Sequence, residues 1–421
     1  MKDGGTTAMA IEGDQACVHC GLCLDYCATY RVVGSEADSP RGRLYLMRHL
    51  TGGSASVDPG VAEHVDRCLG CLACETACPS GVRFGRRLEQ ARPLLTGNRS
   101  AAWRALAGRM MRSHRVLRAA SAAAHAADLI GLARWRRRIP WLGLLPARGA
   151  HVRGDPRAND GSAEPAGPRV FLLRGCGDAL RPSIFRAAAE VLRANGYRVV
   201  ASARGLCCGA LSLHGGQRAE ARRLASDLVA AVEESEATFV ATTAAGCGAM
   251  LRDLESLFDG DPERSRAATR LAAMTRDVCE LLAEAGPRPP KSRPQRPLRV
   301  AYHDACHLLH GMKVEHAPRA VLAAATGNQP VDLGDNHVCC GSAGSYNLRH
   351  HRLALEIGRA KAALVRKCSA DVLAVANVGC ILQLERAAAL EGIDVAVRHP
   401  VEILAEAYRI SGERLSSSGE A

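Results

Sequence analysis

Two segments of this sequence have the same cysteine spacing: Cys17-Val-His-Cys-Gly-Leu-Cys-Leu-Asp-Tyr-Cys27 and Cys68-Leu-Gly-Cys-Leu-Ala-Cys-Glu-Thr-Ala-Cys-Pro79. Three thiolates two residues apart reach three irons of one cubane cluster from a short loop, and the fourth cysteine begins a helix and points to the other cluster. We therefore predict two [4Fe–4S] clusters, the first held by Cys17, Cys20, Cys23 and Cys78, and the second by Cys68, Cys71, Cys74 and Cys27.

This spacing disfavours two other uses of cysteine. A zinc site built from two separated pairs has no use for a third cysteine in the same short run. A secreted disulfide framework needs an export signal, and residues 1–16 are polar and lack the apolar core of one. The second run is followed by Pro79 but the first by Ala28, and we expect this to change hydrogen bonding to the sulfurs without removing a ligand.

The composition predicts a globular protein of a reducing compartment. The 421 residues allow several domains, and 18 cysteines without an export signal are typical of metal ligands or catalytic thiols. No run of about 18 apolar residues is present, so we expect no membrane span and a cytoplasmic location. The formal charge is +12, but the basic residues are almost all arginine and no nucleic-acid-binding motif accompanies them, so we expect no nucleic-acid partner.

The N-terminal half divides into a cluster module and a basic connector. We assign residues 1–95 to a helical two-cluster ferredoxin-like module, with helices over 43–50 and 82–91, and residues 96–168 to a helical connector and linker. Arg41 and Arg43 are candidates for hydrogen bonds to a cluster or to a partner's carboxylates, and solvated arginines at a helix start are the alternative.

The connector leaves two interpretations open. It contains many arginines and the chain's three tryptophans, Trp103, Trp135 and Trp141. Arginine interleaved with tryptophan is typical of peripheral contact with an anionic membrane, here its cytoplasmic face, or with an acidic partner. The alternative is a pair of helices packed on the core, with solvated arginines.

The C-terminal half contains an internal duplication, which we assign to domains 169–290 and 298–410. Each copy alternates strands and helices, which predicts small parallel sheets covered by helices and an α+β / α/β chain overall. Strands are expected at 169–173, 197–201 and 238–242, and again at 298–302, 330–333 and 372–376. The separations from Cys176 to Cys306, Cys207 to Cys339 and Cys247 to Cys380 are 130, 132 and 133 residues.

Each copy places four cysteines at strand ends or helix starts, where open α/β sheets bind ligands. The two sets are Cys176, Cys207, Cys208 and Cys247, and Cys306, Cys339, Cys340 and Cys380. We expect a metal, cluster or redox-thiol site in each copy, and small buried hydrophobes are the alternative. Histidines and a tyrosine accompany the second set as candidate ligands, proton relays or acceptor contacts: His303, His307, His310, His337, Tyr346 and His350.

These motifs resemble those of the glycolate oxidase iron–sulfur subunit family and, more broadly, of heterodisulfide-reductase-like subunits with two CCG cysteine-rich domains. The resemblance rests on both ferredoxin runs, on Pro40-Arg41-Gly42-Arg43, on Tyr302-His303-Asp304-Ala305-Cys306-His307 and on Cys339-Cys340-Gly341-Ser342-Ala343-Gly344. In heterodisulfide reductases a fifth cysteine of the CCG domain helps to hold a noncubane cluster. Ala244 and Asn377 stand at that position here, which leaves a third cluster, a zinc ion or free thiols as candidates.

The resemblance implies an electron-transfer subunit of a 2-hydroxy acid dehydrogenase complex. An FAD-containing partner subunit would oxidise glycolate to glyoxylate, and this chain would pass the electrons to a quinone or another acceptor. We expect no catalytic residue in this chain, because no G-x-G-x-x-G lies between a strand and a helix. The alternatives are a heterodisulfide-reductase-like subunit with a catalytic CCG site, and the equivalent subunit of a lactate or glycerol 3-phosphate dehydrogenase complex.

Overall fold

The N-terminal module is a set of short helices around the two cysteine runs. The computed structural model describes residues 16–48, 50, 57–95, 106, 108–110, 113–132, 139, 142–145, 166–202, 205–292, 296 and 298–411. The module's helical elements are α1 (Ala28–Val33), η2 (Glu36–Asp38), α2 (Pro40–Arg48), α3 (Pro59–Asp66), α4 (Ala73–Thr76), α5 (Phe84–Ala91) and η3 (Arg92–Leu95). Helix α2 begins three residues before the predicted start at Arg43, because Ser39 ends the preceding turn and Pro40 suits a first helical position.

The C-terminal half forms two four-stranded parallel sheets, which confirms the predicted fold class. The first has the order β2-β1-β3-β4 and the second the order β6-β5-β7-β8. The strands are β1 (Arg169–Leu172), β2 (Arg198–Val200), β3 (Phe239–Thr242), β4 (Thr275–Asp277), β5 (Val300–Tyr302), β6 (Val331–Asp332), β7 (Val372–Ala374) and β8 (Ala396–Arg398). Equal strand orders in the two sheets agree with the internal duplication.

Helices cover the sheets and join the two copies. In the first copy they are α9 (Gly177–Leu180), α10 (Pro182–Ala194), α11 (Ala210–His214), α12 (Arg218–Glu234), α13 (Ala245–Arg252), η5 (Leu254–Phe258), α14 (Pro262–Met274) and α15 (Val278–Ala285). In the second they are η6 (His307–Gly311), α16 (His316–Thr326), α17 (Tyr346–Arg349), α18 (His351–Cys368), α19 (Val378–Leu390) and α20 (Pro400–Ile410). Helix α20 packs against both α10 and α16, and one hydrophobic core runs through both sheets. The limits 169–290 and 298–410 therefore stay a prediction.

Strands β4 and β8 were not predicted. Each has three residues with at most one buried aliphatic side chain, so no alternating pattern is visible in the sequence. Each leads into a helix with a capping box, formed by Asp277 with Glu280 and by His399 with Glu402. The position of these strands at a sheet edge is decided by parallel pairing with β3 and β7.

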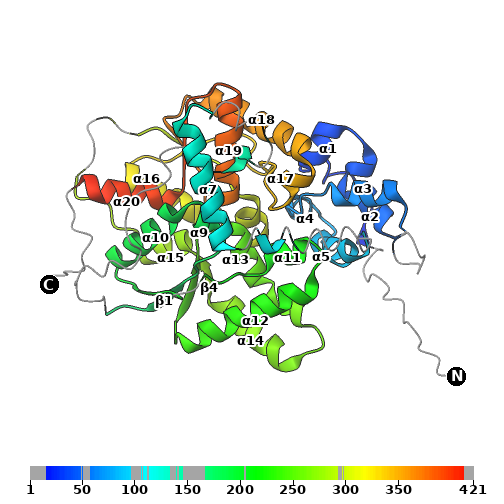
Figure 1. Ribbon diagram of the computed structural model, residues 1–421, viewed down its shortest axis with the longest axis horizontal. Coiled ribbons are helices and arrows are strands. Elements are labelled where there is room, and N and C mark those ends of the chain that lie inside the picture. Colours follow the sequence, from blue (N-terminus) through cyan, green and yellow to red (C-terminus); the bar gives the residue numbers. More distant parts are fainter. Residues whose placement is uncertain are drawn as a thin grey trace.

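The N-terminal module docks on the second copy, as Figure 1 shows with α1 beside α18. Arg31 Nη1 lies 2.9 Å from the Asp335 carboxylate, and the Tyr346 hydroxyl donates to the Arg67 carbonyl at 3.0 Å. Leu69 of the second cysteine run belongs to a hydrophobic cluster that includes Cys306 and Cys339. The second run is therefore covered by the second copy.

The connector is described only in part. Helix α7 (His114–Leu129) confirms that it contains a helix, and the short turn η4 (Leu142–Leu144) follows. The three tryptophans lie outside the described residues, as do several of the connector's arginines. Among the described residues, no helix combines the length and the apolar character that crossing a bilayer requires.

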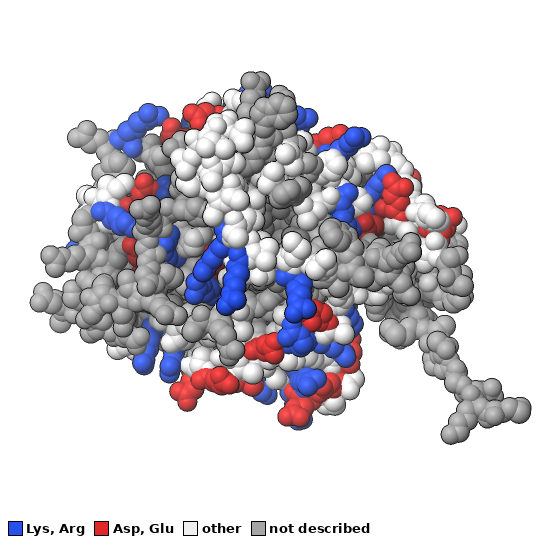
Figure 2. Space-filling view, viewed as in Figure 1, with Lys and Arg blue, Asp and Glu red and all other residues white. Residues whose placement is uncertain are grey.

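The charge on the described part of one face is mixed. Over α12 and α14, at the bottom of Figure 2, basic and acidic side chains lie next to each other. Arg223 pairs with Glu220 at 2.9 Å and with Asp227 at 3.0 Å, and Arg270 of α14 pairs with Glu233 at 2.8 Å. Arg223 and Arg270 are therefore paired locally.

Gly341, which follows Cys339-Cys340, is expected to be intolerant of substitution. Its φ is +87°, and a Cβ there would lie 2.6 Å from the Ala354 carbonyl oxygen of α18. Gly334 provides a control, since its φ is +79° but a Cβ would meet nothing within 4 Å. We expect Gly334→Ala to cost about 1–2 kcal/mol for the left-handed conformation, and Gly341→Ala about 1–3 kcal/mol more because the turn must move off α18. Denaturant unfolding measures both, and equal losses would contradict the role of the close approach.

Candidate metal centres

The structure brings together cysteines from both N-terminal runs. One cavity is lined by Cys27 of the first run and by Cys68, Cys71 and Cys74 of the second. Cys27 directly precedes α1, so its side chain leaves the first loop and enters the space enclosed by the second. This is the crossed arrangement expected of a two-cluster ferredoxin, and four thiols around one enclosed space fit a cubane.

Two hydrogen-bond donors reach sulfur atoms that line this cavity. The backbone N–H of Gly70 donates to Cys68 Sγ at 3.4 Å, and Arg43 Nη1 donates to Cys27 Sγ at 3.8 Å. The Arg43 side chain is only 1% exposed and also donates to Thr29 and Asp38. The sequence left open whether Arg41 or Arg43 faces a cluster. Arg43 reaches Cys27 at the cavity of the second run, whereas Arg41 pairs with Glu36 at the surface and donates to the His19 carbonyl of the first run at 3.3 Å.

The first run lies nearer the surface. Cys20 is exposed, Cys17 and Cys23 are half-buried, and the two apolar residues of the same loop, Val18 and Leu22, are 67% and 58% exposed. Burial and, to a smaller extent, the neighbouring thiols raise the pKa of the Cys23 thiol to about 11. Cys78 is half-buried, and its Sγ accepts a hydrogen bond from the Val82 N–H at 3.5 Å. The sharing of Cys78 with the first run stays a prediction.

The second run touches the second cysteine-rich copy directly. A hydrogen bond between the thiols of Cys71 and Cys339 raises the pKa of Cys71 well above its usual range, and burial raises it further. Cys339 Sγ lies 3.8 Å from Cys306 Sγ. The thiols of the predicted second cluster and of the second copy are thus contiguous, which the sequence did not reveal.

The second copy gathers its four cysteines at the carboxyl end of its sheet. Cys306, Cys339, Cys340 and Cys380 are all buried. Cys340 interacts with the thiols of both Cys339 and Cys380. The His303 ring lies with Cys340 and Cys380, and one ligand atom from each of these three residues falls within 4.8 Å of the others.

The first copy gathers Cys176, Cys207, Cys208 and Cys247 in the same way. The hydrogen bonds that the thiols of Cys176 and Cys208 form with Cys207 raise the pKa values of those two thiols. Three of the four cysteines are only half-buried, in contrast to the second copy. Cys279 is fully buried in α15 and Cys368 ends α18, apart from both sets.

The other candidate side chains have separate roles. His310 bonds through Nδ1 to the Thr76 hydroxyl at 3.0 Å and through Nε2 to the His337 carbonyl at 2.9 Å. The His337 ring packs on Tyr26, with the ring centroids 4.4 Å apart. These contacts are made to or beside the N-terminal module and not to the thiols of the second copy.

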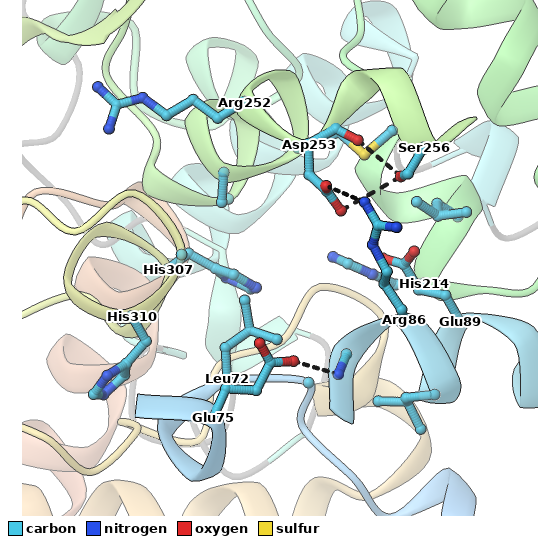
Figure 3. Close-up of a pocket in the computed structure, with 18 of the residues that line it drawn as sticks. Leu72, Glu75, Arg86, Glu89, His214, Arg252, Asp253, Ser256, His307 and His310 are labelled. Atoms are coloured by element: carbon cyan, nitrogen blue, oxygen red, sulfur yellow. Dashed lines mark hydrogen bonds and ion pairs between the residues drawn. The ribbon is translucent and has the colours of Figure 1, made fainter. Parts of the chain in front are cut away.

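A cavity of about 310 Å³ lies where the N-terminal module meets both copies (Figure 3). Its wall includes Gly70 of the second run. The side chains of His214, from α11, and His307, from η6, point into it. Their rings are stacked, with an angle of 9° between the ring planes and 5.9 Å between the ring centroids. Burial lowers the pKa of His307 to about 4 and that of His214 well below its usual range. Both rings are therefore neutral at pH 7.

Asp66 makes a second ionic contact between the N-terminal module and the second copy, besides that of Arg31 with Asp335. Its carboxylate pairs with Arg349 and accepts from His350 Nε2 at 2.9 Å. Burial alone would raise the pKa of Asp66, but the hydrogen bond from His350 and the charge of Arg349 outweigh it and lower the pKa.

Acidification is expected to weaken this contact. Because the folded-state pKa of Asp66 lies below the unfolded value of about 3.9, its stabilisation is complete above that pH and is lost as the pH falls through the folded pKa. We expect Asp66→Asn to cost about 1.5–3 kcal/mol at pH 7, and the difference from the native chain to shrink at low pH. Equilibrium unfolding between about pH 7 and pH 3 measures this, with the exposed Asp394→Asn as control. A difference independent of pH would contradict it.

Comparison with known proteins agrees with this layout. A family model described as "4Fe-4S dicluster domain" matches residues 14–82, and one described as "Cysteine-rich domain" matches residues 170–252 and 300–385. The chain is 32% identical to the "Glycolate oxidase iron-sulfur subunit" of Escherichia coli (strain K12) over 413 residues, which cover 95% of this chain and 96% of that protein.

Two further relatives widen the comparison. A Bacillus subtilis (strain 168) protein named "Probable glycolate oxidase iron-sulfur subunit" is 32% identical over 419 residues, 93% of each chain. A fumarate reductase (CoM/CoB) subunit of Methanothermobacter marburgensis is 26% identical over 94% of this chain and 72% of that protein. The duplicated cysteine-rich half and the dicluster module thus recur together, and the chain belongs to the family of glycolate oxidase iron–sulfur subunits.

Proposed function

We propose that this chain is the electron-transfer subunit of a 2-hydroxy acid dehydrogenase complex, with glycolate as the substrate. An FAD-containing partner oxidises glycolate to glyoxylate, and this chain passes the electrons to a quinone-type acceptor. When bound, [4Fe–4S] clusters supply one-electron transfer at a potential that their surroundings set. The relatives named as glycolate oxidase subunits support the choice of substrate.

One observation carries the proposal: the thiols form a contiguous series through the molecule. It begins at the exposed loop of Cys20, continues through the cavity lined by Cys27 and Cys71, and reaches Cys339 of the second copy. A protein that only stored iron or sensed it would have no need of such a series. The residues of this chain hold the clusters, exclude water from the second one and adjust its potential through Arg43.

The two cysteine runs have different surroundings. Val18 and Leu22, both largely exposed, flank the ligands of the first cluster, and an apolar loop of this kind suits docking of the flavoprotein. Beside the second run, the cavity of Figure 3 has a volume in the range of small-molecule sites and borders Gly70. We place the acceptor there, with His214 and His307 as hydrogen-bonding partners for its oxygens.

Peripheral membrane contact forms part of the proposal. The end of α7 and the residues after it present Leu129, Ile130 and Leu132, which are 53%, 73% and 46% exposed. An exposed apolar group next to an arginine-rich segment suits the interface of an anionic bilayer. Binding of the chain to anionic vesicles, weakened in Ile130→Ser, would support this contact.

A second candidate function is reduction of a disulfide at the second copy. The contact between Cys71 and Cys339 favours it, because electrons could pass from the second cluster to the thiols there. The similarity to the fumarate reductase (CoM/CoB) protein points the same way. Against it, Asn377 stands where the noncubane site of heterodisulfide reductases has its fifth cysteine.

The deciding experiment is anaerobic purification with the partners retained, followed by substrate titration. We expect a co-purifying flavoprotein, about eight irons per chain, and bleaching of the cluster absorption by glycolate. Bleaching by lactate or glycerol 3-phosphate but not by glycolate would reassign the substrate. Disulfide turnover by the isolated chain, abolished in Cys339→Ser, would favour the second candidate.

A further inference from the structure

His303 is buried with no hydrogen-bond partner on either ring nitrogen among the described residues. It follows β5 directly, its backbone N–H bonds to the Ala374 carbonyl, and its side chain is 0% exposed. A buried polar group left unpaired loses its hydration without compensation, so an imidazole without a partner in a fully enclosed position requires an explanation. A metal bound by one ring nitrogen would remove the penalty for that nitrogen.

Two thiols stand where such a metal would need them. Cys340 and Cys380 are 0% and 1% exposed, and one ligand atom of each lies within 4.8 Å of a ring nitrogen of His303 and of the other. The three residues come from three elements: the end of β5, the turn before Gly341 and the first turn of α19. Among the described residues, no other set of three histidine, cysteine or acidic side chains meets this spacing.

The spacing of the three ligand atoms suits a single metal ion. Zinc–sulfur and zinc–nitrogen bonds of about 2.3 and 2.0 Å place tetrahedral ligand atoms roughly 3.3–3.8 Å apart. Two thiolates and an imidazole form a donor set for zinc or another borderline-soft metal and not for magnesium or calcium, which prefer oxygen. The charges of two thiolates and a divalent ion also cancel, which a fully buried site requires.

The groups around His303, Cys340 and Cys380 are consistent with deprotonated, negatively charged sulfur. Asn377 Nδ2 donates to Cys380 Sγ at 3.1 Å, so this sulfur is already an acceptor. Asn377 stands at the position of the missing fifth cysteine and thus serves the site as a donor. The thiol of Cys339 interacts with Cys340 but lies outside the spacing that His303, Cys340 and Cys380 share.

The first copy allows the same position to be compared within one chain. Counting back three residues from Cys176 and from Cys306 places Leu173 where the second copy has His303. Leu173 is buried in the apolar core beneath its own cysteines. The first copy therefore keeps the four thiols but lacks the nitrogen ligand.

We propose that the second cysteine-rich copy holds one zinc ion through His303, Cys340 and Cys380, and that the first copy does not. Because zinc has no redox chemistry, its role is to fix the Cys339–Cys340 turn beside Cys71. This proposal does not depend on which substrate the complex oxidises.

The test is zinc analysis and zinc-edge X-ray absorption of the full chain, purified anaerobically from cells supplied with zinc. Iron does not contribute at this edge. We expect about one zinc per chain, with sulfur near 2.3 Å and nitrogen near 2.0 Å. His303→Leu, which installs the residue of the first copy, and Cys380→Ser should each lower the zinc content at least tenfold. Iron should stay near eight per chain, which also shows that these variants fold.

Two further variants complete the design. His303→Cys should keep the zinc with a shell of sulfur alone, and Cys247→Ser of the first copy should leave zinc and nitrogen unchanged. Zinc that persists in His303→Leu with its shell unaltered would overturn the proposal. An iron content of about twelve that falls to eight in Cys380→Ser would overturn it in favour of a third cluster. A native chain that takes up no zinc on titration would also overturn it.

Discussion

Replacing Cys27 by alanine is expected to remove or alter the second [4Fe–4S] cluster, although Cys27 belongs to the first cysteine run. The structure places Cys27 on the cavity lined by Cys68, Cys71 and Cys74, because the helix that begins at Ala28 turns its side chain away from the first loop. Losing one of four thiolate ligands should lower the iron content from about eight towards four per chain.

Comparison of Cys27→Ala with three other cysteine variants tests this prediction. After dithionite reduction, the paramagnetic resonance spectrum of Cys27→Ala should match that of Cys74→Ala and differ from that of Cys20→Ala. Cys368→Ser is the control, since Cys368 ends α18 away from both runs and should leave iron and spectrum unchanged. A Cys27→Ala spectrum that matched Cys20→Ala would show that each run binds its own cluster.

Arg43 is expected to control both the stability of the N-terminal module and the potential of the second cluster. Its guanidinium is buried, donates to Asp38 at 3.0 Å and to the His64 carbonyl at 2.7 Å, and reaches Cys27 Sγ at 3.8 Å. Removing one partner of a buried ion pair leaves the other charge uncompensated, which typically costs about 3–5 kcal/mol. His64 and Arg67 also contact Asp38, so the lower end of this range is expected for Arg43→Gln.

The same substitution should make the second cluster harder to reduce. A positive charge beside a cluster ligand favours the reduced, more negative state, so its loss lowers the potential. A fall on the order of 59 mV corresponds to a tenfold change in the one-electron equilibrium. Redox titration followed by paramagnetic resonance measures the shift, and Arg43→Lys should restore part of it.

Arg41→Gln is the matched control for this experiment. Arg41 lies two residues earlier on the same helix but pairs with Glu36 at the surface. We expect it to leave the second potential and the unfolding midpoint unchanged. Equal shifts for Arg41→Gln and Arg43→Gln would mean that general surface charge, and not the buried contact with Cys27, sets the potential.

Much of the fold could be predicted because its signals are local. The spacing of Cys17–Cys27 and Cys68–Cys78 depends on loop geometry around a cluster, which a few neighbouring residues determine. The duplication was visible because both copies keep a Cys-Cys-Gly turn, and Gly209 and Gly341 both have φ of +87°. The edge strands β4 and β8 were missed, since three residues carry no periodic pattern.

The candidate sites could be predicted only as sets of residues. Histidines 303, 307 and 310 lie within eight positions, yet His303 faces two thiols, His307 faces a cavity and His310 bonds to the N-terminal module. A one-residue difference in position changes the direction of a side chain, and the π-helical turn η6 departs from the usual helical spacing, so that direction could not be predicted from the sequence. The burial of Arg43 could not be predicted from the sequence, because an arginine at the start of a helix is equally compatible with a solvent-exposed position.

The sequence alone determined the kinds of ligand, their grouping into two runs and two copies, and the family to which the chain belongs, because these depend on spacing along the chain. Only the tertiary structure decided which groups meet across it. The contact between Cys71 and Cys339 joins residues 268 positions apart, and the placement of His303 between Cys340 and Cys380 requires three elements to converge at one sheet edge. Such contacts arise from the packing of the N-terminal module on the second copy and from the parallel order of its strands, and no local pattern encodes either.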